Sequence, residues 1–197
     1  MWTVDRLFAE IKKDEAYYQK SGGGITVSGG EATMQLPFLL KFLKMCKEAK
    51  IQTAIETSGY YSQDTLEKLV PLIDLLMFDL KIMDSSLHKR YCGVPNDRIL
   101  MNAIWIAHHY KSTSNQFWIR TPIIPQYTAT DENIISIAKF IVEQMENKID
   151  RWDLLAFNNL AQSKYDRMDR EWTLKGSPLL TDDEMNHFKA IATKIGV

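Results

Sequence analysis

Short apolar segments alternate with longer amphipathic segments along this 197-residue chain, and this alternation constrains the fold more than any other feature. We expect strands where β-branched and apolar residues predominate, at residues 23–28, 51–57, 75–81, 117–125 and 151–157. Apolar residues at helical spacing predict helices over 3–20, 35–49, 62–70 and 97–110, and after the capping residues Thr130 and Thr181. Strands that alternate with helices indicate an α/β fold with a parallel sheet. Two arrangements stay open here, a doubly wound sheet or a whole or partial barrel of the TIM type, in a single domain over 1–197.

Polar residues follow each predicted strand, whereas the bodies of the strands are apolar. Strand by strand, these residues are Ser28, Gly29, Gly30 and Glu31, then Glu56, Thr57 and Ser58, then Asp79 and Lys81, then Arg120 and Thr121, and last Asn158 and Asn159. Because the carboxyl ends of parallel strands meet at one edge, we expect a pocket there with both signs of charge, suited to a zwitterion such as an amino acid. The alternative is a generic α/β domain in which Asp79 pairs with Lys81 and Arg120 pairs with a carboxylate for structural reasons.

The stretch SGGGITVSGGEAT, residues 21–33, contains five of the nine glycines. Gly29 and Gly30 let a ligand approach the main chain. The spacing is not that of a phosphate-binding loop, and the carboxylate of Glu31 would repel phosphate. An ammonium group is a better ligand for Glu31 and a main-chain carbonyl. We expect residues 22–24 to form the entry from helix to strand.

Composition and charge argue against several other classes of function. The net charge is −1, and no basic patch interleaves with aromatic residues, so we expect no nucleic-acid partner. No apolar run approaches the roughly 18 residues that span a bilayer, and the acidic N-terminal segment is unlike a secretory signal, so we expect a cytoplasmic protein without a membrane partner. The four histidines include no pair at i, i+4, which argues against a metal-dependent hydrolase.

Six motifs occur here in one order: SGGGITVSGGEAT, AIETSGY, LLMFDLKIMD, NDRILMN, IRTPIIP and LLAFNNLAQSKY. From about residue 3 to about residue 175, the sequence resembles the glycyl-radical-enzyme activating enzymes of the radical S-adenosylmethionine (SAM) superfamily, such as pyruvate formate-lyase activating enzyme. The resemblance implies a partial (β/α) barrel of the TIM type, with about five of the family's six strands present. It also implies a SAM site with Gly29, Gly30 and Glu31 at the methionine amino group, and with further contacts from Glu56, Ser58, Lys81, Arg120 and Asn158. Glu56 and Asp79 fall where a monovalent cation binds, and no side chain is implied as a catalytic base.

The family binds a 4Fe-4S cluster through a CxxxCxxC motif, and this sequence contains only Cys46 and Cys92. The cluster cysteines are therefore absent from the chain. Cys46 continues the apolar stripe of Leu39 and Leu43 at helical spacing, which predicts a buried core thiol. We expect the chain to be the C-terminal part of an activating enzyme, beginning after the cluster segment.

For the intact enzyme, the resemblance implies that an electron donor reduces the cluster, which cleaves SAM to methionine and a 5′-deoxyadenosyl radical. That radical takes a hydrogen atom from a glycine of a partner such as pyruvate formate-lyase. We expect this chain alone to be inactive, to bind SAM weakly, and to self-associate through residues 23–28 as an exposed strand edge. The alternative function is a module without a cluster that binds SAM or docks a glycyl-radical enzyme without activating it.

Overall fold

The computed structural model describes residues 1–110 and 115–197 and contains one sheet of five strands in the order β1-β2-β3-β4-β5. Their bounds are Gly24–Val27 for β1, Gln52–Thr57 for β2, Leu75–Asp79 for β3, Gln116–Ile123 for β4 and Arg151–Ala156 for β5. Each neighbouring pair is parallel, so all five carboxyl ends lie at the same edge. This confirms the predicted parallel sheet.

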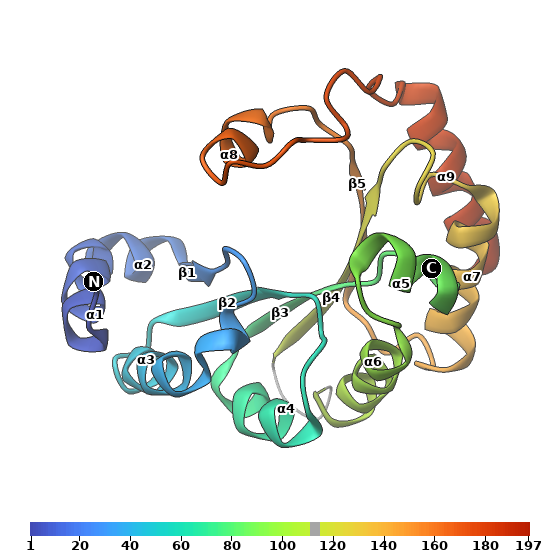
Figure 1. Ribbon diagram of the computed structural model, residues 1–197. Coiled ribbons are helices and arrows are strands. Elements are labelled where there is room, and N and C mark those ends of the chain that lie inside the picture. The colour runs from blue at the N-terminus through green and yellow to red at the C-terminus, as the bar shows by residue number, and fades with distance from the viewer. Residues whose placement is uncertain (111–114) are drawn as a thin grey trace.

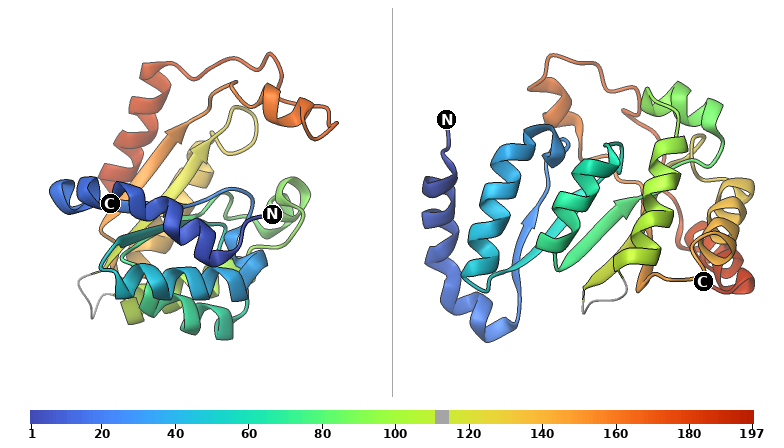
Figure 2. Two further views of the ribbon diagram at one scale, coloured as in Figure 1. Left: turned by 90° about the vertical axis from the view of Figure 1, so that its left-hand side faces the viewer. Right: turned by 90° about the horizontal axis from the view of Figure 1, so that it is seen from below.

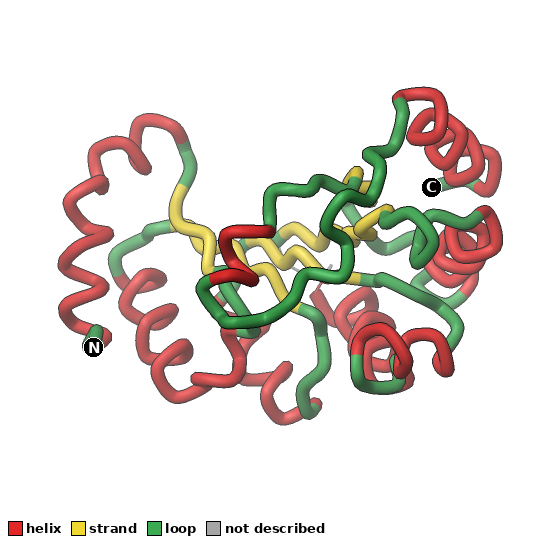
Figure 3. The backbone as a smooth tube through the Cα atoms, turned by 45° about the horizontal axis from the view of Figure 1, so that its top comes forward, coloured by secondary structure: helices red, strands yellow, loops and turns green. Residues whose placement is uncertain are grey.

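Most of the helices lie along the outer face of the curved sheet (Figures 1 and 2). They are α1 (Val4–Ile11), α2 (Glu15–Ser21), α3 (Leu36–Glu48), α4 (Gln63–Leu69), α5 (Ser85–Cys92), α6 (Asp97–Tyr110), α7 (Asp131–Glu143), α8 (Gln162–Asp166) and α9 (Asp182–Ile195). The short α8 lies on the other side, above the concave face, and the terminal helices lie at opposite ends of the sheet (Figures 1 and 3). A curved parallel sheet with helices outside is a partial (β/α) barrel, as the fold prediction states.

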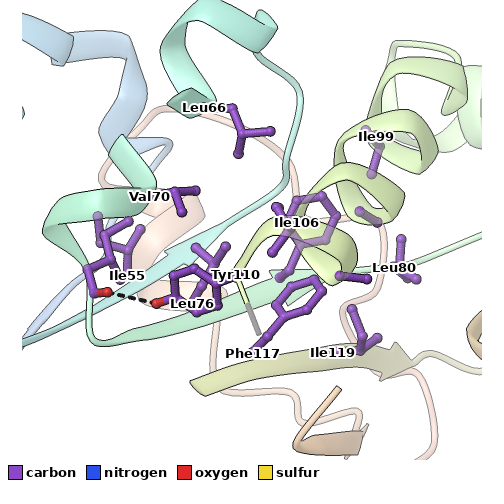
Figure 4. Close-up of a cluster of buried hydrophobic side chains, with 14 of the residues drawn as sticks. Ile55, Leu66, Val70, Leu76, Leu80, Ile99, Ile106, Tyr110, Phe117 and Ile119 are labelled. Carbon is purple, nitrogen blue, oxygen red and sulfur yellow. Dashed lines mark hydrogen bonds between the residues drawn. The ribbon is translucent and has the colours of Figure 1, made fainter. Parts of the chain in front are cut away.

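The main core lies between the sheet and helices α3, α4, α6 and α7 (Figure 4). Alternate residues of the central strands point into it and are fully buried, namely Ile55, Leu76, Phe78, Phe117 and Ile119. The Tyr110 hydroxyl at the end of α6 donates to the Ile73 carbonyl at 2.8 Å, which satisfies that buried phenol. Because side chains alternate along a strand, the intervening residues face the concave side.

The N-terminal segment departs from its prediction. Residues 3–20 form α1, a 3₁₀ turn at Lys12–Asp14 and α2, instead of a single helix. The apolar stripe of α1 ends at Ile11, and α2 has no buried residue, so packing does not hold one straight helix there. Gly22 ends α2 with a φ of 67°, which confirms the predicted glycine entry to β1.

Other element boundaries differ by a few residues. Strand β3 ends at Asp79, so Lys81 lies beyond the strand, and the polar segment after β5 contains α8. The capping predictions are confirmed, because Thr130 accepts from the Asn133 N–H and Thr181 forms a reciprocal capping box with Glu184. Within the described residues, no helix combines the length and the apolar character needed to cross a membrane.

Candidate functional site

Charged side chains of three neighbouring strands meet on the concave face near the carboxyl edge. Glu56 comes from β2, Asp79 from β3 and Arg120 from β4, and Asp79 and Arg120 are partners in the strand register. The guanidinium of Arg120 reaches across β3, where its Nη1 lies 2.5 Å from Glu56 Oε1 and 3.9 Å from Met77 Sδ. The sheet thus brings together residues 64 positions apart, as the polar strand ends predict.

Glu31 receives hydrogen bonds from three residues at once. Its carboxylate accepts from the Ser58 N–H at 2.9 Å, the Ser58 hydroxyl at 2.8 Å, the Thr57 hydroxyl at 3.0 Å and the Thr33 hydroxyl at 2.9 Å. Burial by itself raises the pKa of Glu31, but the bonds from Ser58, Thr33 and Thr57 outweigh burial and lower the pKa below its usual value. Glu31 is therefore a fixed anion that ties the loop after β1 to the end of β2.

These bonds limit how Glu31 meets a ligand. A carboxylate offers about four lone-pair sites, and at least as many donors already occupy them. An incoming ammonium group must displace one of these donors or bind the neighbouring main-chain carbonyls. The glycines next to Glu31 leave room for such an approach, because a Cβ added at Gly29 or Gly30 would meet no atom within 4 Å. Gly29 has a φ of 122°, a conformation that other residues rarely adopt.

Glu56 is also an ionised carboxylate. The Ser28 hydroxyl donates to its Oε2 at 2.5 Å, and Arg120 binds its other oxygen. The Ser28 bond lowers the pKa of Glu56 most, burial opposes it, and the hydrogen bond and charge of Arg120 lower the pKa further. Glu56 therefore links the end of β1 to β4 through its two oxygens.

Asp79 differs from the two glutamates because burial dominates its environment. Burial raises the pKa of Asp79 above its usual value, although Lys81 and Arg120 act in the opposite direction. The Lys81 ammonium lies 3.2 Å from Asp79 Oδ2, which is the ion pair that the alternative of a structural role describes. The Glu56–Arg120 and Asp79–Lys81 pairs together make a neutral group that exposes both signs of charge.

Asn158 stands apart from these contacts. It is exposed after β5, and its side-chain oxygen accepts from the Leu160 N–H at 3.2 Å. No described hydrogen bond or ion pair joins it to Glu31, Glu56 or Arg120. Its role as a SAM contact stays a prediction.

The sequence does not predict that hydroxyl groups hold the two glutamate carboxylates. Ser28 follows Val27, which pairs with Ile55, so the register places Ser28 beside Glu56. The Thr57 hydroxyl binds Glu31 from the end of β2, whereas the Thr33 hydroxyl binds it locally, from two residues further along the same loop. The sequence places hydroxyl residues at the ends of the first two strands, but only the register of β1 with β2 shows that Ser28 binds Glu56.

A cleft of about 440 Å³ adjoins this group at Lys81 and extends toward α8. Aromatic and cationic side chains form much of its wall, namely Arg90, Tyr91, Tyr127 and Tyr165. Tyr91 and Tyr127 pack edge to face with ring centroids 4.9 Å apart. The charged group therefore adjoins a cleft whose wall includes three tyrosines.

The described residues do not fit an iron–sulfur cluster. Residues 1–110 and 115–197 contain no group of three or more Cys, His, Asp or Glu side chains that could hold a metal ion. Cys46 is buried in α3 and Cys92 is exposed on α5. Burial raises the pKa of the Cys46 thiol to about 11, so it is not a thiolate at neutral pH.

This fold and this edge of the sheet define a known class. Residues 3–141 match the model of the radical SAM superfamily, and the chain belongs to that superfamily. It is 34% identical over 190 residues to the (2S)-3-sulfopropanediol dehydratase activating enzyme of Klebsiella oxytoca, covering 96% of this chain and 59% of the relative. It is 35% identical over 174 residues to the (2S)-3-sulfopropanediol sulfolyase activating enzyme of Bilophila wadsworthia (strain 3_1_6), covering 88% of this chain and 56% of the relative.

A solved structure has a similar fold. A domain of pyruvate-formate lyase-activating enzyme from Bacteroides vulgatus ATCC 8482 superposes with a TM-score of 0.71 and 26% identity, covering 89% of this chain and 96% of that domain. All three proteins are named as activating enzymes, which agrees with the resemblance found in the sequence. The chain spans between half and two thirds of the length of the two curated relatives.

Proposed function

We propose that this chain forms the SAM-binding part of an activating enzyme that installs a glycyl radical on a partner enzyme. The observation that carries the proposal is the group of ionised carboxylates and cations at the carboxyl edge of a radical SAM fold, beside two exposed glycines. An amino acid zwitterion needs acceptors for its ammonium and donors for its carboxylate, and this edge offers both. A single-domain organisation over 1–197 is part of the proposal.

The residues divide by the part of SAM they would bind. Main-chain carbonyls at Gly29 and Gly30, with Glu31, would receive the methionine ammonium, while Lys81 and Arg120 would bind the carboxylate. Further contacts would come from Ser58 and Asn158, and Glu56 with Asp79 would hold a monovalent cation. SAM bound to a reduced 4Fe-4S cluster is the source of a 5′-deoxyadenosyl radical, and the residues described here bind SAM, orient it and limit its access to water.

The partner in this proposal is a glycyl-radical enzyme, with pyruvate formate-lyase as one candidate. In the intact enzyme, a separate electron donor would reduce the cluster. We place the protein in the cytoplasm. The sequence contains no CxxxCxxC motif. We therefore expect the 197-residue chain alone to be inactive and to bind SAM weakly, because the contacts that SAM makes to a cluster are missing.

Titration of the ¹⁵N-labelled chain with SAM, followed by NMR, tests the proposal. We expect millimolar SAM to shift the amide signals of Gly30, Ser58 and Lys81, while signals of α9 stay unchanged. Arg120→Ala should weaken the response, and adenosine without the methionine moiety should not reproduce the shifts at Gly30. If the amide signals at the carboxyl edge did not shift at the highest soluble concentration of SAM, SAM binding would be contradicted. If calorimetry gave a micromolar affinity for SAM, the expectation of weak binding would be contradicted.

The alternative is a module without a cluster that binds SAM or a glycyl-radical enzyme and does not activate it. The observation that favours this alternative is the placement of Cys46 and Cys92 on separate helices, one of them buried. The genomic reading frame upstream of Met1 distinguishes the two functions. An in-frame CxxxCxxC motif supports the activating enzyme, and a start codon at Met1 without such a motif supports the module.

A further inference from the structure

Three buried asparagines bind the main chain of two loops at the carboxyl edge. Asn96, Asn102 and Asn133 are only 2%, 5% and 8% exposed. Asn96 and Asn102 are the two ends of the NDRILMN motif, and the SAM contacts proposed above give neither of them a role. All three direct side-chain amides at backbone groups of residues that follow β2 or β3, and Asn133 also donates to the Thr128 carbonyl, beyond β4, at 3.3 Å.

Asn102 binds the loop after β2. From α6, its Nδ2 donates to the Gly59 carbonyl at 2.8 Å and to the Tyr61 carbonyl at 2.9 Å. This loop starts at Ser58, whose N–H and hydroxyl both bind Glu31. The Asn102 amide therefore fixes the segment from which the Glu31 carboxylate receives two of its donors.

Asn96 and Asn133 bind the loop after β3. Asn96 precedes α6, and its Nδ2 donates to the carbonyls of Ile82 at 3.0 Å and Met83 at 2.8 Å. From α7, Asn133 accepts from the Met83 N–H at 3.0 Å and donates to the Lys81 carbonyl at 2.9 Å. The backbone around Lys81 is thus held by two helices.

The chemistry of these contacts requires an amide. Carbonyl groups just beyond a strand have no ladder partner, and a buried carbonyl without a donor is costly. A primary amide supplies two N–H donors on one nitrogen, which a hydroxyl or a carboxylate does not. Asparagine at these positions satisfies two carbonyls at once and joins each loop to a rigid helix.

We propose that Asn96, Asn102 and Asn133 are positioning residues of the SAM site. Through them, α6 and α7 hold the loop of Ser58 and the loop of Lys81 at a fixed separation, one loop serving the ammonium end of the ligand and the other its carboxylate end. This inference rests on the proposed function. It adds residues that touch no ligand but set the distance between the groups that do.

Hydrogen exchange measured by mass spectrometry tests the loops without any ligand. We expect Asn102→Ala to speed exchange in residues 57–62 by about tenfold and to leave residues 80–84 unchanged. Asn96→Ala should speed exchange in residues 80–84 and leave residues 57–62 unchanged. Asn186→Ala, at an exposed position of α9, is the matched control and should change neither segment. Faster exchange throughout the chain in the Asn96 and Asn102 variants would show a general loss of stability and overturn the proposal.

A pair of ligands tests the effect on the site. Decarboxylated SAM keeps the amino group but lacks the carboxylate, so it does not need Lys81. We expect Asn96→Ala to weaken SAM binding several-fold and to leave binding of decarboxylated SAM unchanged, whereas Asn102→Ala should weaken both. Equal losses for both ligands in Asn96→Ala, or no loss in either variant, would overturn the proposal.

Failure of the proposed function can be told apart from failure of the positioning proposal. If the unsubstituted chain shows no response to SAM, the proposed function fails, and this result does not depend on any asparagine variant. If an alanine variant does not fold, Asn96→Ser and Asn102→Ser, which keep one hydroxyl donor for one carbonyl, allow the same comparison with a smaller expected change.

Discussion

Glu31 and Asp79 carry the same chemical group at the same edge of the sheet, yet the fold moves their pKa values in opposite directions. Glu31 is surrounded by N–H and O–H donors, which favour the charged form. Asp79 is dominated by burial, which favours the neutral form, and Lys81 only partly offsets that burial. This edge of the sheet thus combines one fixed anion with one carboxylate that protonates more readily.

The first prediction concerns the pH dependence of stability at Glu31. A carboxyl whose pKa is lower in the folded chain stabilises the fold above its unfolded pKa, and this stabilisation is lost as the pH falls through the folded value. We expect Glu31→Gln to lower the free energy of unfolding by about 1–3 kcal/mol near neutral pH. The loss should shrink as the pH falls below about 4. Urea denaturation at several pH values measures this.

Asp79→Asn is the control with the opposite sign. Its pKa is raised in the folded chain, so the stabilisation by its carboxyl is present below the unfolded pKa and is lost as the pH rises through the folded value. The advantage of the unsubstituted chain over Asp79→Asn should therefore grow as the pH falls. If the change in the free energy of unfolding depended on pH in the same way in both variants, the environments assigned to Glu31 and Asp79 would be wrong.

The second prediction compares two glycines with similar φ angles. Gly59 has a φ of 74°, and a Cβ there would lie 2.0 Å from Cζ of the buried Phe78. Gly93 has a φ of 86°, but a Cβ there would meet nothing within 4 Å. We expect Gly93→Ala to cost only about 1 kcal/mol of strain, and Gly59→Ala to cost about 1–3 kcal/mol more because Phe78 must move. If both variants lost the same free energy of unfolding in urea denaturation, the steric argument would be refuted.

At the scale of single elements, helix α9 depends on its first residues. Thr181 accepts from the Glu184 N–H at 3.2 Å, while Glu184 accepts from the Thr181 N–H at 2.7 Å. The third prediction is that Thr181→Ala lowers the free energy of unfolding by about 1 kcal/mol, because a free N–H remains at the helix start. Thr181→Ser keeps the hydroxyl and should retain most of the stability in thermal denaturation. Similar losses in the two variants would assign the effect to packing instead.

The order and type of most elements follow from the sequence, because strand and helix periodicities are local. The strand ends also predict that Glu56, Asp79, Lys81 and Arg120 meet. What the sequence does not show is which partner each side chain selects. Ser28 binds Glu56, and Asn102 binds the loop after β2, only because the register and the curvature of the sheet bring distant segments together. The break after Ile11 likewise depends on what α1 packs against, and periodicity alone does not report that.

For the whole molecule, the feature that bears on association is the edge of the sheet at β1. Strand β1 pairs with β2 through the register of Gly24 with Gln52 and Thr26 with Ala54, and no other described strand pairs with it. An apolar groove lined by residues such as Leu7, Ile25 and Phe38 lies beside this edge. Unpaired strand edges invite pairing with another chain.

The fourth prediction is that the chain self-associates through β1 at high concentration. Thr26→Lys places a charge on this exposed edge and should reduce the associated fraction in sedimentation velocity. Thr193→Lys adds the same charge on the exposed surface of α9 and should leave association unchanged. A chain that stays monomeric at high concentration, or equal effects of both lysines, would contradict pairing at this edge.

The strand order described above also bears on how the chain acquires its shape. Each described strand pairs with the next one in the sequence, and these parallel pairings join residues between 21 positions apart, as Ala54 with Leu75, and 41 positions apart, as Leu75 with Gln116. Parallel pairings across such separations form slowly. The sheet can grow one strand at a time as the chain leaves the ribosome, in the order of synthesis. Arg120 reaches Glu56 only after β4 has been added beside β3, so the charged group is completed late, when four of the five strands are already in place.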